Sequence, residues 1–363
     1  MWLDESINAR YTIEAGKRTM MQKDAFPVNE ALCAYLKQYG RDVELPIRYT
    51  DLINYSYAHS LKDKKGKWTH WENAVYEPDQ LVNLKVSLIK CYTLLKSGVM
   101  LHDTTAYDIE RIDFCEYGNS IPFRIKIIDI KKGHPDFFYI KQADANRIYG
   151  LEIEHLLTHN PINFLHFENT LIEEHIDGIP GDAFLQQSPP QTIAEKAAVA
   201  KAFVQFNESC FVRLLGDMRS YNFVVNPIAC FGAIHYRFRA IDFDQQSYEA
   251  KKISYFPQFY KENSAYVSMV LQSLGAAEIE QNRQLQFAAM AARIVTYRRQ
   301  LMALLNSMVD DDISENYKIN NLRNELNDHF KTNRFSRCRT MGAIVKQQLK
   351  QVLQQHVKQA ILK

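Results

Sequence analysis

Two aspartates and an asparagine between positions 217 and 242 are the residues whose types and spacing could do chemistry. Asp217 lies five residues before Asn222, and Asp242 ends the apolar segment that comes later. One carboxylate can orient or deprotonate an acceptor hydroxyl, while an amide oxygen and a second carboxylate hold magnesium against nucleotide phosphates. Magnesium prefers such oxygen ligands. The spacing therefore predicts phosphoryl transfer, with Asp217 as the catalytic residue and Asn222, Asp242 and the nearby Asp244 as metal ligands.

The elements around these residues would bring them to one place. Two short apolar segments, 223–225 and 236–241, flank a loop at 226–235, and this pattern predicts a β-hairpin. The hairpin would carry Asn222 at its start and Asp242 at its end. A helix is expected before it, from Thr192 to about Val212, because alanine and other helix-forming residues dominate there.

A strand-rich part is expected upstream of that helix. Residues 107–129 alternate in polarity around a Gly-Asn pair, which predicts a hairpin. The backbone N–H groups of Gly118, Asn119 and Ser120 would form an anion-binding concavity at its turn, although a plain hairpin turn is the commoner role of such a pair. This segment therefore predicts a strand pair with a candidate phosphate-binding turn.

Further elements surround a single lysine. Residues 137–141 are a short, strongly β-prone segment that ends in Lys141, a cation on a rigid strand that would reach phosphate oxygens. A helix over 143–158 and a strand over 170–176 are expected to follow. The first hundred residues are expected to be mostly helical, with an amphipathic helix over 80–95.

Composition sets outer limits on function. The 363 residues favour two or three domains, and 46% hydrophobic with 24% charged residues is ordinary for globular proteins. A net charge of +2 indicates no particular partner. The six cysteines match no zinc spacing and are expected to be buried thiols in a reducing compartment. Neither a secretory signal nor an apolar run of about 18 residues occurs, so no membrane partner and a cytoplasmic location are expected.

Two segments of the chain resemble the protein-kinase-like superfamily. The loop from Gly216 through Asp217 to Asn222 resembles the family's His-Gly-Asp-x-x-x-x-Asn loop, and Ile241-Asp242-Phe-Asp244 resembles its metal-binding segment. The resemblance covers roughly residues 105–310 and is strongest to the small-molecule branch, which includes aminoglycoside and choline kinases. It implies ATP and Mg²⁺ as cofactors and a small hydroxylated molecule as acceptor, with a protein acceptor left open.

The resemblance also implies an architecture. An α+β, two-lobed kinase-like fold is expected, with an antiparallel-sheet lobe at 105–178 and a helical lobe at 179–363 that carries the catalytic and metal-binding loops. Residues 1–104 would form an additional helical region outside the resemblance. The nucleotide is expected to lie between the strand-rich and helical parts.

Individual residues receive roles by the same resemblance. Lys141 would contact the phosphates, and Glu152 would be its ion-pair partner, with Glu154 as the second choice. The strand and hinge that contain Glu173 and His175 would receive adenine through backbone groups. The turn at Gly118, Asn119 and Ser120 lies where the family's phosphate-covering loop is expected.

Departures from the family pattern leave alternatives open. Leu215 stands where the family has histidine, and the turn at 117–120 has one glycine instead of a glycine-rich series. A catalytically inactive, kinase-like binding or regulatory scaffold is therefore the main alternative. Asp217 and Asn222 could also be turn or cap residues. Nucleic-acid binding by the basic C-terminal helices is disfavoured, because acids at 324–328 dilute that charge.

Overall fold

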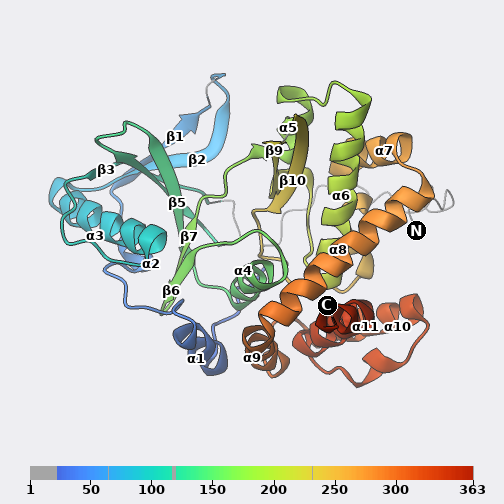
Figure 1. The fold of residues 1–363 in the computed structure, drawn as a ribbon. Coiled ribbons are helices and arrows are strands. Elements are labelled where there is room, and N and C mark those ends of the chain that lie inside the picture. Colours follow the sequence, from blue (N-terminus) through green and yellow to red (C-terminus); the bar gives the residue numbers. More distant parts are fainter. Residues whose placement is uncertain (1–22, 64, 117–119, 231, 363) are drawn as a thin grey trace. The chain divides into compact units, whose positions relative to one another are not determined.

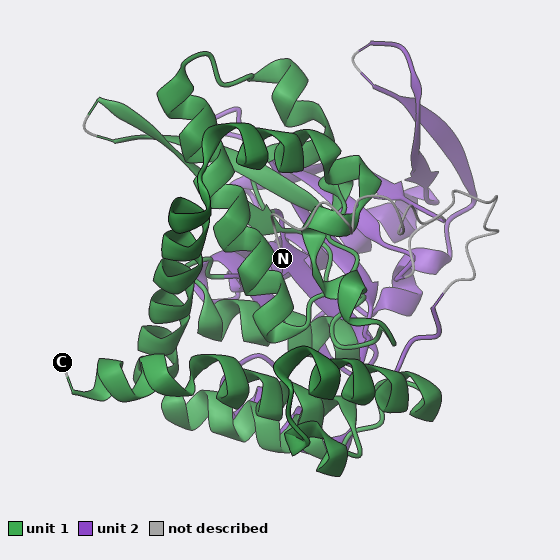
Figure 2. Cartoon of the chain, turned by 90° about the vertical axis from the view of Figure 1, so that its right-hand side faces the viewer, with its two compact units in different colours: residues 1–21, 146–161, 176–363 green, residues 22–145, 162–175 purple. Residues whose placement is uncertain are grey.

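A computed structural model gives the α+β fold of residues 23–63, 65–116, 120–230 and 232–362 (Figure 1). The chain divides into two compact units (Figure 2). Among the described residues, unit 1 contains those in 146–161 and 176–362, and unit 2 contains those in 23–145 and 162–175. Unit 2 therefore joins residues on both sides of the domain border expected at 104/105. The helix expected over 143–158, inside the expected strand-rich lobe, belongs mostly to unit 1.

Unit 2 is built on a seven-stranded antiparallel sheet with the order β1-β2-β3-β4-β5-β7-β6. The strands are β1 (Tyr57–Lys62), β2 (Trp68–Val75), β3 (Tyr107–Phe114), β4 (Phe123–Asp129), β5 (Pro135–Gln142), β6 (Phe164–Phe167) and β7 (Thr170–Glu174). The expected strand pair within 107–129 is confirmed, as are the strands near 137–141 and 170–176. Its Gly118-Asn119 turn lies outside the described residues.

The described residues before position 100 are not all helical, because β1 and β2 form a hairpin within 57–75. These two strands are largely exposed or half-buried and rich in polar residues. They pair through the backbone without the apolar alternation that reveals a strand in sequence.

Three helices complete unit 2: α1 (Glu30–Gln38), α2 (Tyr49–Ile53) and α3 (Pro78–Ser97). Helix α3 confirms the expected amphipathic helix, and Gly98 ends it in the left-handed region with φ +71°. Its buried face packs against the sheet, where alternate residues point inward. This core includes Leu84, Leu88, Ile109, Phe123, Ile125, Ile127, Phe138, Ile140 and Ile172.

Unit 1 has a three-stranded antiparallel sheet, β10-β9-β8, surrounded by helices. Its strands are β8 (Ile179–Pro180), β9 (Phe223–Cys230) and β10 (Ala233–Ala240). Its α-helices are α4 (Ala145–Leu157), α5 (Gly181–Gln187), α6 (Ile193–Arg213), α7 (Ser264–Ser273), α8 (Ala276–Thr296), α9 (Arg298–Val309), α10 (Asn316–Phe330) and α11 (Met341–Ile361). The first residue of α4, Ala145, belongs to unit 2.

Short 3-10 helices lie between these elements: η1 (Ser220–Asn222), η2 (Lys252–Tyr255), η3 (Pro257–Phe259), η4 (Lys261–Asn263) and η5 (Arg334–Arg337). The β9–β10 hairpin packs beside α6 (Figure 1) through a cluster of aromatic rings formed by Phe203, Phe206, Phe223, Phe238 and Tyr266. Within the described ranges, no helix has the length and apolar character needed to span a bilayer.

Candidate active site

The loop that carries Asp217 follows α6 directly and has an unusual backbone. Leu214 caps the helix at φ +55°, and Asp217 also has φ +55°, a region that residues other than glycine seldom adopt. The loop is held by hydrogen bonds that the N–H groups of Gly216 and Asp217 donate to the carbonyls of Gln245 and Ser254. Because Gly216 and Asp217 are both tied to the same downstream segment, the loop has a defined shape that presents Asp217.

Gln246 supplies support at the point where the family pattern has a histidine. Leu215 is buried and forms an isolated bridge with Gln246, whose Nε2 donates to the carbonyl of Arg213 at 2.7 Å. Asn146 on α4 donates in turn to the Gln246 carbonyl at 2.8 Å. Sequence reasoning did not reveal this buried glutamine.

The side chain of Asp217 is held by two neighbours in the same loop. Arg219 Nε donates to Asp217 Oδ1 at 2.7 Å, and Asn222 Nδ2 donates to the Asp217 carbonyl at 2.8 Å and to Oδ2 at 3.3 Å. Arg219 also donates to Glu262 at 2.8 Å. Burial raises the pKa of Asp217, while Arg219 opposes that shift. The structure thus brings Asp217 and Asn222 together, and it adds Arg219, which sequence reasoning missed.

The β9–β10 hairpin places Asn222 and Asp242 at one end, as expected from the sequence. Phe223 pairs with Ala240, and the N–H of Ile241 donates to the carbonyl of Asn222 at 3.0 Å. Asn222 therefore immediately precedes the first paired residue, and Asp242 lies two residues after the last. The predicted hairpin is confirmed, and its pairing register explains why residues twenty positions apart in sequence become neighbours in space.

Arg147 on α4 meets both aspartates of the 242–244 segment. Its Nη1 donates to Asp242 Oδ1 at 2.9 Å and to Asp244 Oδ1 at 2.8 Å. The side chains of Arg147 and Asp244 are 2% and 7% exposed, whereas that of Asp242 is 35% exposed. Gly150, one turn further along α4, would place an added Cβ only 2.9 Å from Phe243 Cβ. This close approach lets the helix present Arg147 to the carboxylates.

The carboxylate oxygens of Asp242 and Asp244 are suitable ligands for a hard cation. One oxygen from each of Asp242 and Asp244 lies within 2.9 Å of the same nitrogen atom, so the two carboxylates converge on a positive charge. Oxygen ligands are those that Mg²⁺ prefers. Within the described part of the chain, no three His, Cys, Asp or Glu side chains are grouped to hold a metal. A magnesium site here would therefore need the Asn222 amide oxygen in addition to carboxylates.

Lys141 in unit 2 forms a buried ion pair with Glu173, its Nζ lying 2.9 Å from Glu173 Oε2. The pair links neighbouring strands β5 and β7. Glu173 was expected only near an adenine-binding hinge, so its pairing with the lysine is a finding that sequence reasoning missed. His175, the other expected hinge residue, shares a hydrogen bond between Nδ1 and the Tyr139 hydroxyl at 3.1 Å.

The two acids expected to hold Lys141 have partners within unit 1. Gln300 Nε2 donates to Glu152 Oε2 at 3.4 Å, and Glu154 forms a buried ion pair with Arg213. The pairing of Glu152 with Lys141 stays a prediction. Of the expected phosphate-binding turn, Gly118 and Asn119 lie outside the described residues. Ser120 is buried, and its carbonyl accepts a hydrogen bond from the N–H of Gln142 at 3.4 Å, beside Lys141.

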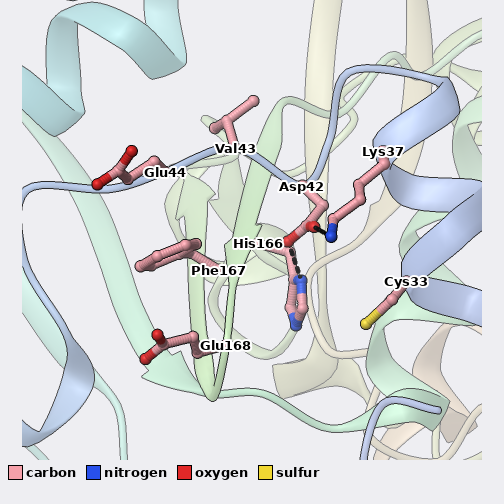
Figure 3. A pocket seen from close by; sticks show the side chains of 8 residues that line it. All are labelled: Cys33, Lys37, Asp42, Val43, Glu44, His166, Phe167 and Glu168. Atoms are coloured by element: carbon pink, nitrogen blue, oxygen red, sulfur yellow. Dashed lines mark hydrogen bonds and ion pairs between the residues drawn. The ribbon is translucent and has the colours of Figure 1, made fainter. Parts of the chain in front are cut away.

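A cavity of about 310 Å³ in unit 2 lies between α1, the chain that follows it and β6 (Figure 3). A hydrogen bond of 2.8 Å between His166 Nδ1 and Asp42 Oδ1 forms part of its lining. Cys33 and Phe167 line other sides. None of the site residues expected from the sequence lines this cavity, so it is a feature that those expectations did not address.

Comparisons with known proteins identify no family. No protein-family model matches the chain, and no curated protein matches it. Among solved structures, the chain is similar to one described as "Crystal structure of Rad53 kinase domain and SCD2", with 11% sequence identity. That match covers 49% of this chain and 80% of the other, with a TM-score of 0.22. A superposition at this level carries no argument about fold or activity.

Proposed function

We propose that this protein is a kinase-like phosphotransferase that uses ATP and Mg²⁺ to phosphorylate a hydroxyl group of a small molecule. The observation that carries the proposal is the cluster at the end of the β9–β10 hairpin. There Asn222 donates to Asp217, its backbone contacts Ile241, and Asp242 follows at once. Phosphoryl transfer requires a carboxylate for the acceptor hydroxyl beside oxygen ligands for the metal, and this cluster contains both kinds of group.

Each residue has a role that follows from its surroundings. Asp217 would accept the hydroxyl proton or orient the hydroxyl, because its raised pKa makes it a better base than an ordinary aspartate. Arg219 would fix the orientation of that carboxylate. Asn222 and Asp242 would hold the magnesium ion, with Asp244 as a further ligand. The ion, when bound, would neutralise charge on the phosphates.

Lys141 would supply a positive charge to the nucleotide phosphates. It lies on the third strand of the consecutive β3–β4–β5 meander, and the lysine of protein kinases likewise occupies a third strand. Glu173 would keep its ammonium group in place. ATP is therefore expected to need Lys141 for productive binding.

Calorimetry with and without Mg²⁺ tests the binding step. The wild-type protein should bind ATP at micromolar to millimolar concentration, more tightly when Mg²⁺ is present. Asp217→Asn should keep this affinity and strongly lower the rate of phosphoryl transfer to an acceptor found by screening hydroxylated metabolites. Absence of ATP binding at millimolar concentration in both conditions would contradict the proposed function.

An inactive binding scaffold is the second candidate, and Arg147 is the observation that favours it. A guanidinium already occupies the point where the two carboxylates converge, and Asp217 is also paired with an arginine. A scaffold of this kind would bind nucleotide without turnover. Nucleotide binding accompanied by no ATP hydrolysis and no transfer, unchanged by Asp217→Asn, would favour this candidate over the enzyme.

A further inference from the structure

We propose that Arg111 and Arg124 on the sheet of unit 2 form an anion site for the phosphate chain of the nucleotide. This inference rests on the proposed function and names the groups that would hold the phosphates. Between β3 and β4 the sequence has a single glycine, where the resemblance implies a glycine-rich series that covers the phosphates. Two guanidinium groups on the strands that flank this turn would take over that role.

The two arginines are organised by one buried carboxylate. Asp113 on β3 pairs directly with Arg124 on β4, and Arg111 lies two residues before Asp113 on the same strand, so all three point to the same face. Arg124 donates to Asp113 Oδ2 from Nη2 at 2.7 Å and from Nε at 3.0 Å. Arg111 donates to both oxygens of Asp113 from Nε and Nη2. The Asp113 side chain is 0% exposed.

This arrangement leaves an excess of positive charge. One carboxylate neutralises only one of the two guanidinium groups, and the neighbouring Lys126 is already paired with Glu110 at 2.7 Å. Within the described ranges, the Nη1 groups of Arg111 and Arg124 donate to no protein acceptor. The two side chains are 33% and 23% exposed. A phosphate group matches such fixed, planar donors, which bind its oxygens in pairs.

Aromatic contacts fix the plane of Arg124. Its Cζ lies 4.3 Å from the centre of the Trp71 ring and 5.8 Å from that of Phe137. A guanidinium stacked in this way loses less conformational freedom when it binds an anion, because its orientation is already set. Asp113 therefore preorganises both arginines, and the aromatic rings additionally fix the plane of the Arg124 guanidinium.

The arginines lie on the same face of the sheet as Lys141. Arg124 pairs with Tyr139 on β5, and Lys141 is two residues further along that strand. The Lys141 ammonium lies 5.4 Å from the centre of the Tyr139 ring. Diagonal neighbours of this kind are about 7–8 Å apart across a sheet. Arg124 and Lys141 therefore flank Tyr139 as two cations within reach of one phosphate chain.

A purely structural role is the competing explanation, since Arg111, Asp113 and Arg124 also tie β3 to β4. It predicts a loss of stability on substitution but no change in anion affinity. We would therefore measure binding of inorganic tripolyphosphate, ATP and adenosine by calorimetry to the full chain. The variants are Arg111→Gln, which removes the partly exposed arginine, and Arg124→Lys, which keeps the charge and removes the planar fork. Arg48→Gln is the matched control, because Arg48 forms an exposed pair with Glu168 in the same unit.

Each arginine variant should lower the affinity for both tripolyphosphate and ATP by about tenfold. This is the effect expected when a hydrogen bond to a charged group is lost. Adenosine binding should not change, and Arg48→Gln should behave as wild type. Tripolyphosphate binding that depends on the arginines while ATP does not bind would support the anion site and refute the proposed nucleotide reaction. Wild-type affinity for tripolyphosphate in both folded arginine variants, checked by circular dichroism, would overturn the inference.

Discussion

Replacing Arg147 by methionine should reveal how strongly the Asp242–Asp244 pair depends on a cation. The change removes the guanidinium and keeps an apolar side chain of similar length. Breaking a buried ion pair by removing one partner costs about 3–5 kcal/mol, because a charge is left buried without compensation. Asp244 is buried, whereas Asp242 is about one-third exposed and is partly screened by water. We therefore expect a loss near the lower end of that range in the free energy of unfolding.

Magnesium should recover part of this loss. The two carboxylates converge on one point, so a divalent ion can take the place of the guanidinium. A ligand that binds only the native state stabilises it by RT ln(1 + [L]/Kd), which gives about 1.4 kcal/mol for 10 mM ion and a Kd of about 1 mM. Urea unfolding of Arg147→Met with and without MgCl₂ measures this recovery, and NaCl at matched ionic strength controls for screening.

Arg213→Met provides a matched control. Arg213 is also buried and pairs with a buried carboxylate, but Glu154 is the only acid with which it forms an ion pair in the described structure. The two variants should lose comparable stability, and only Arg147→Met should recover with Mg²⁺. Equal recovery in both variants, or none in Arg147→Met, would refute the reasoning that the Asp242–Asp244 pair is a cation site.

Four further changes test other parts of the molecule. Asp217→Asn should lower phosphoryl transfer about 10²–10⁴-fold with little change in ATP affinity, measured by product formation and calorimetry. Gly150→Ala should cost about 1–3 kcal/mol in urea unfolding, since its Cβ would lie 2.9 Å from Phe243 Cβ. Gln246→Ala should lower stability by about 1–3 kcal/mol, because it leaves the buried Arg213 carbonyl without its donor. Burial, with Lys252 nearby, lowers the pKa of His329 from 6.5 to about 4. The unfolded chain therefore binds a proton between these pH values that the native state does not. This contribution to stability is present above pH 6.5 and is lost as pH falls towards 4, and His329→Gln should flatten that dependence in unfolding measured at pH 7 and pH 5.

The sequence predicted local elements well where apolar periodicity was strong. The helix ended by Gly98 and the hairpin between Asn222 and Asp242 each depend on residues close together in the chain. The β1–β2 hairpin was missed because its strands are polar and mostly exposed. Apolar periodicity in a sequence arises from burial of one face, so a strand that buries few side chains shows no such pattern.

Partners distant in sequence could not be predicted in the same way. Arg147 meets Asp242 across 95 positions, and Lys141 meets Glu173 across 32. A charged residue on a helix or strand has many candidate partners, and only the packing of the elements selects one. The single available signal was the glycine at position 150, whose missing side chain allows α4 to approach Phe243.

The interleaved path of the chain between the two units has a consequence for synthesis. All residues of unit 2 have been made once position 175 is reached, whereas unit 1 needs the long segment from 176 to 363. Since domains generally fold in the order in which the ribosome delivers them, the large sheet is expected to form first. The α4 helix would then emerge with Arg147 still lacking the carboxylates that it meets in the finished protein. A chain truncated after residue 175 should therefore hold a folded sheet together with a helix whose Arg147 lacks its carboxylate partners.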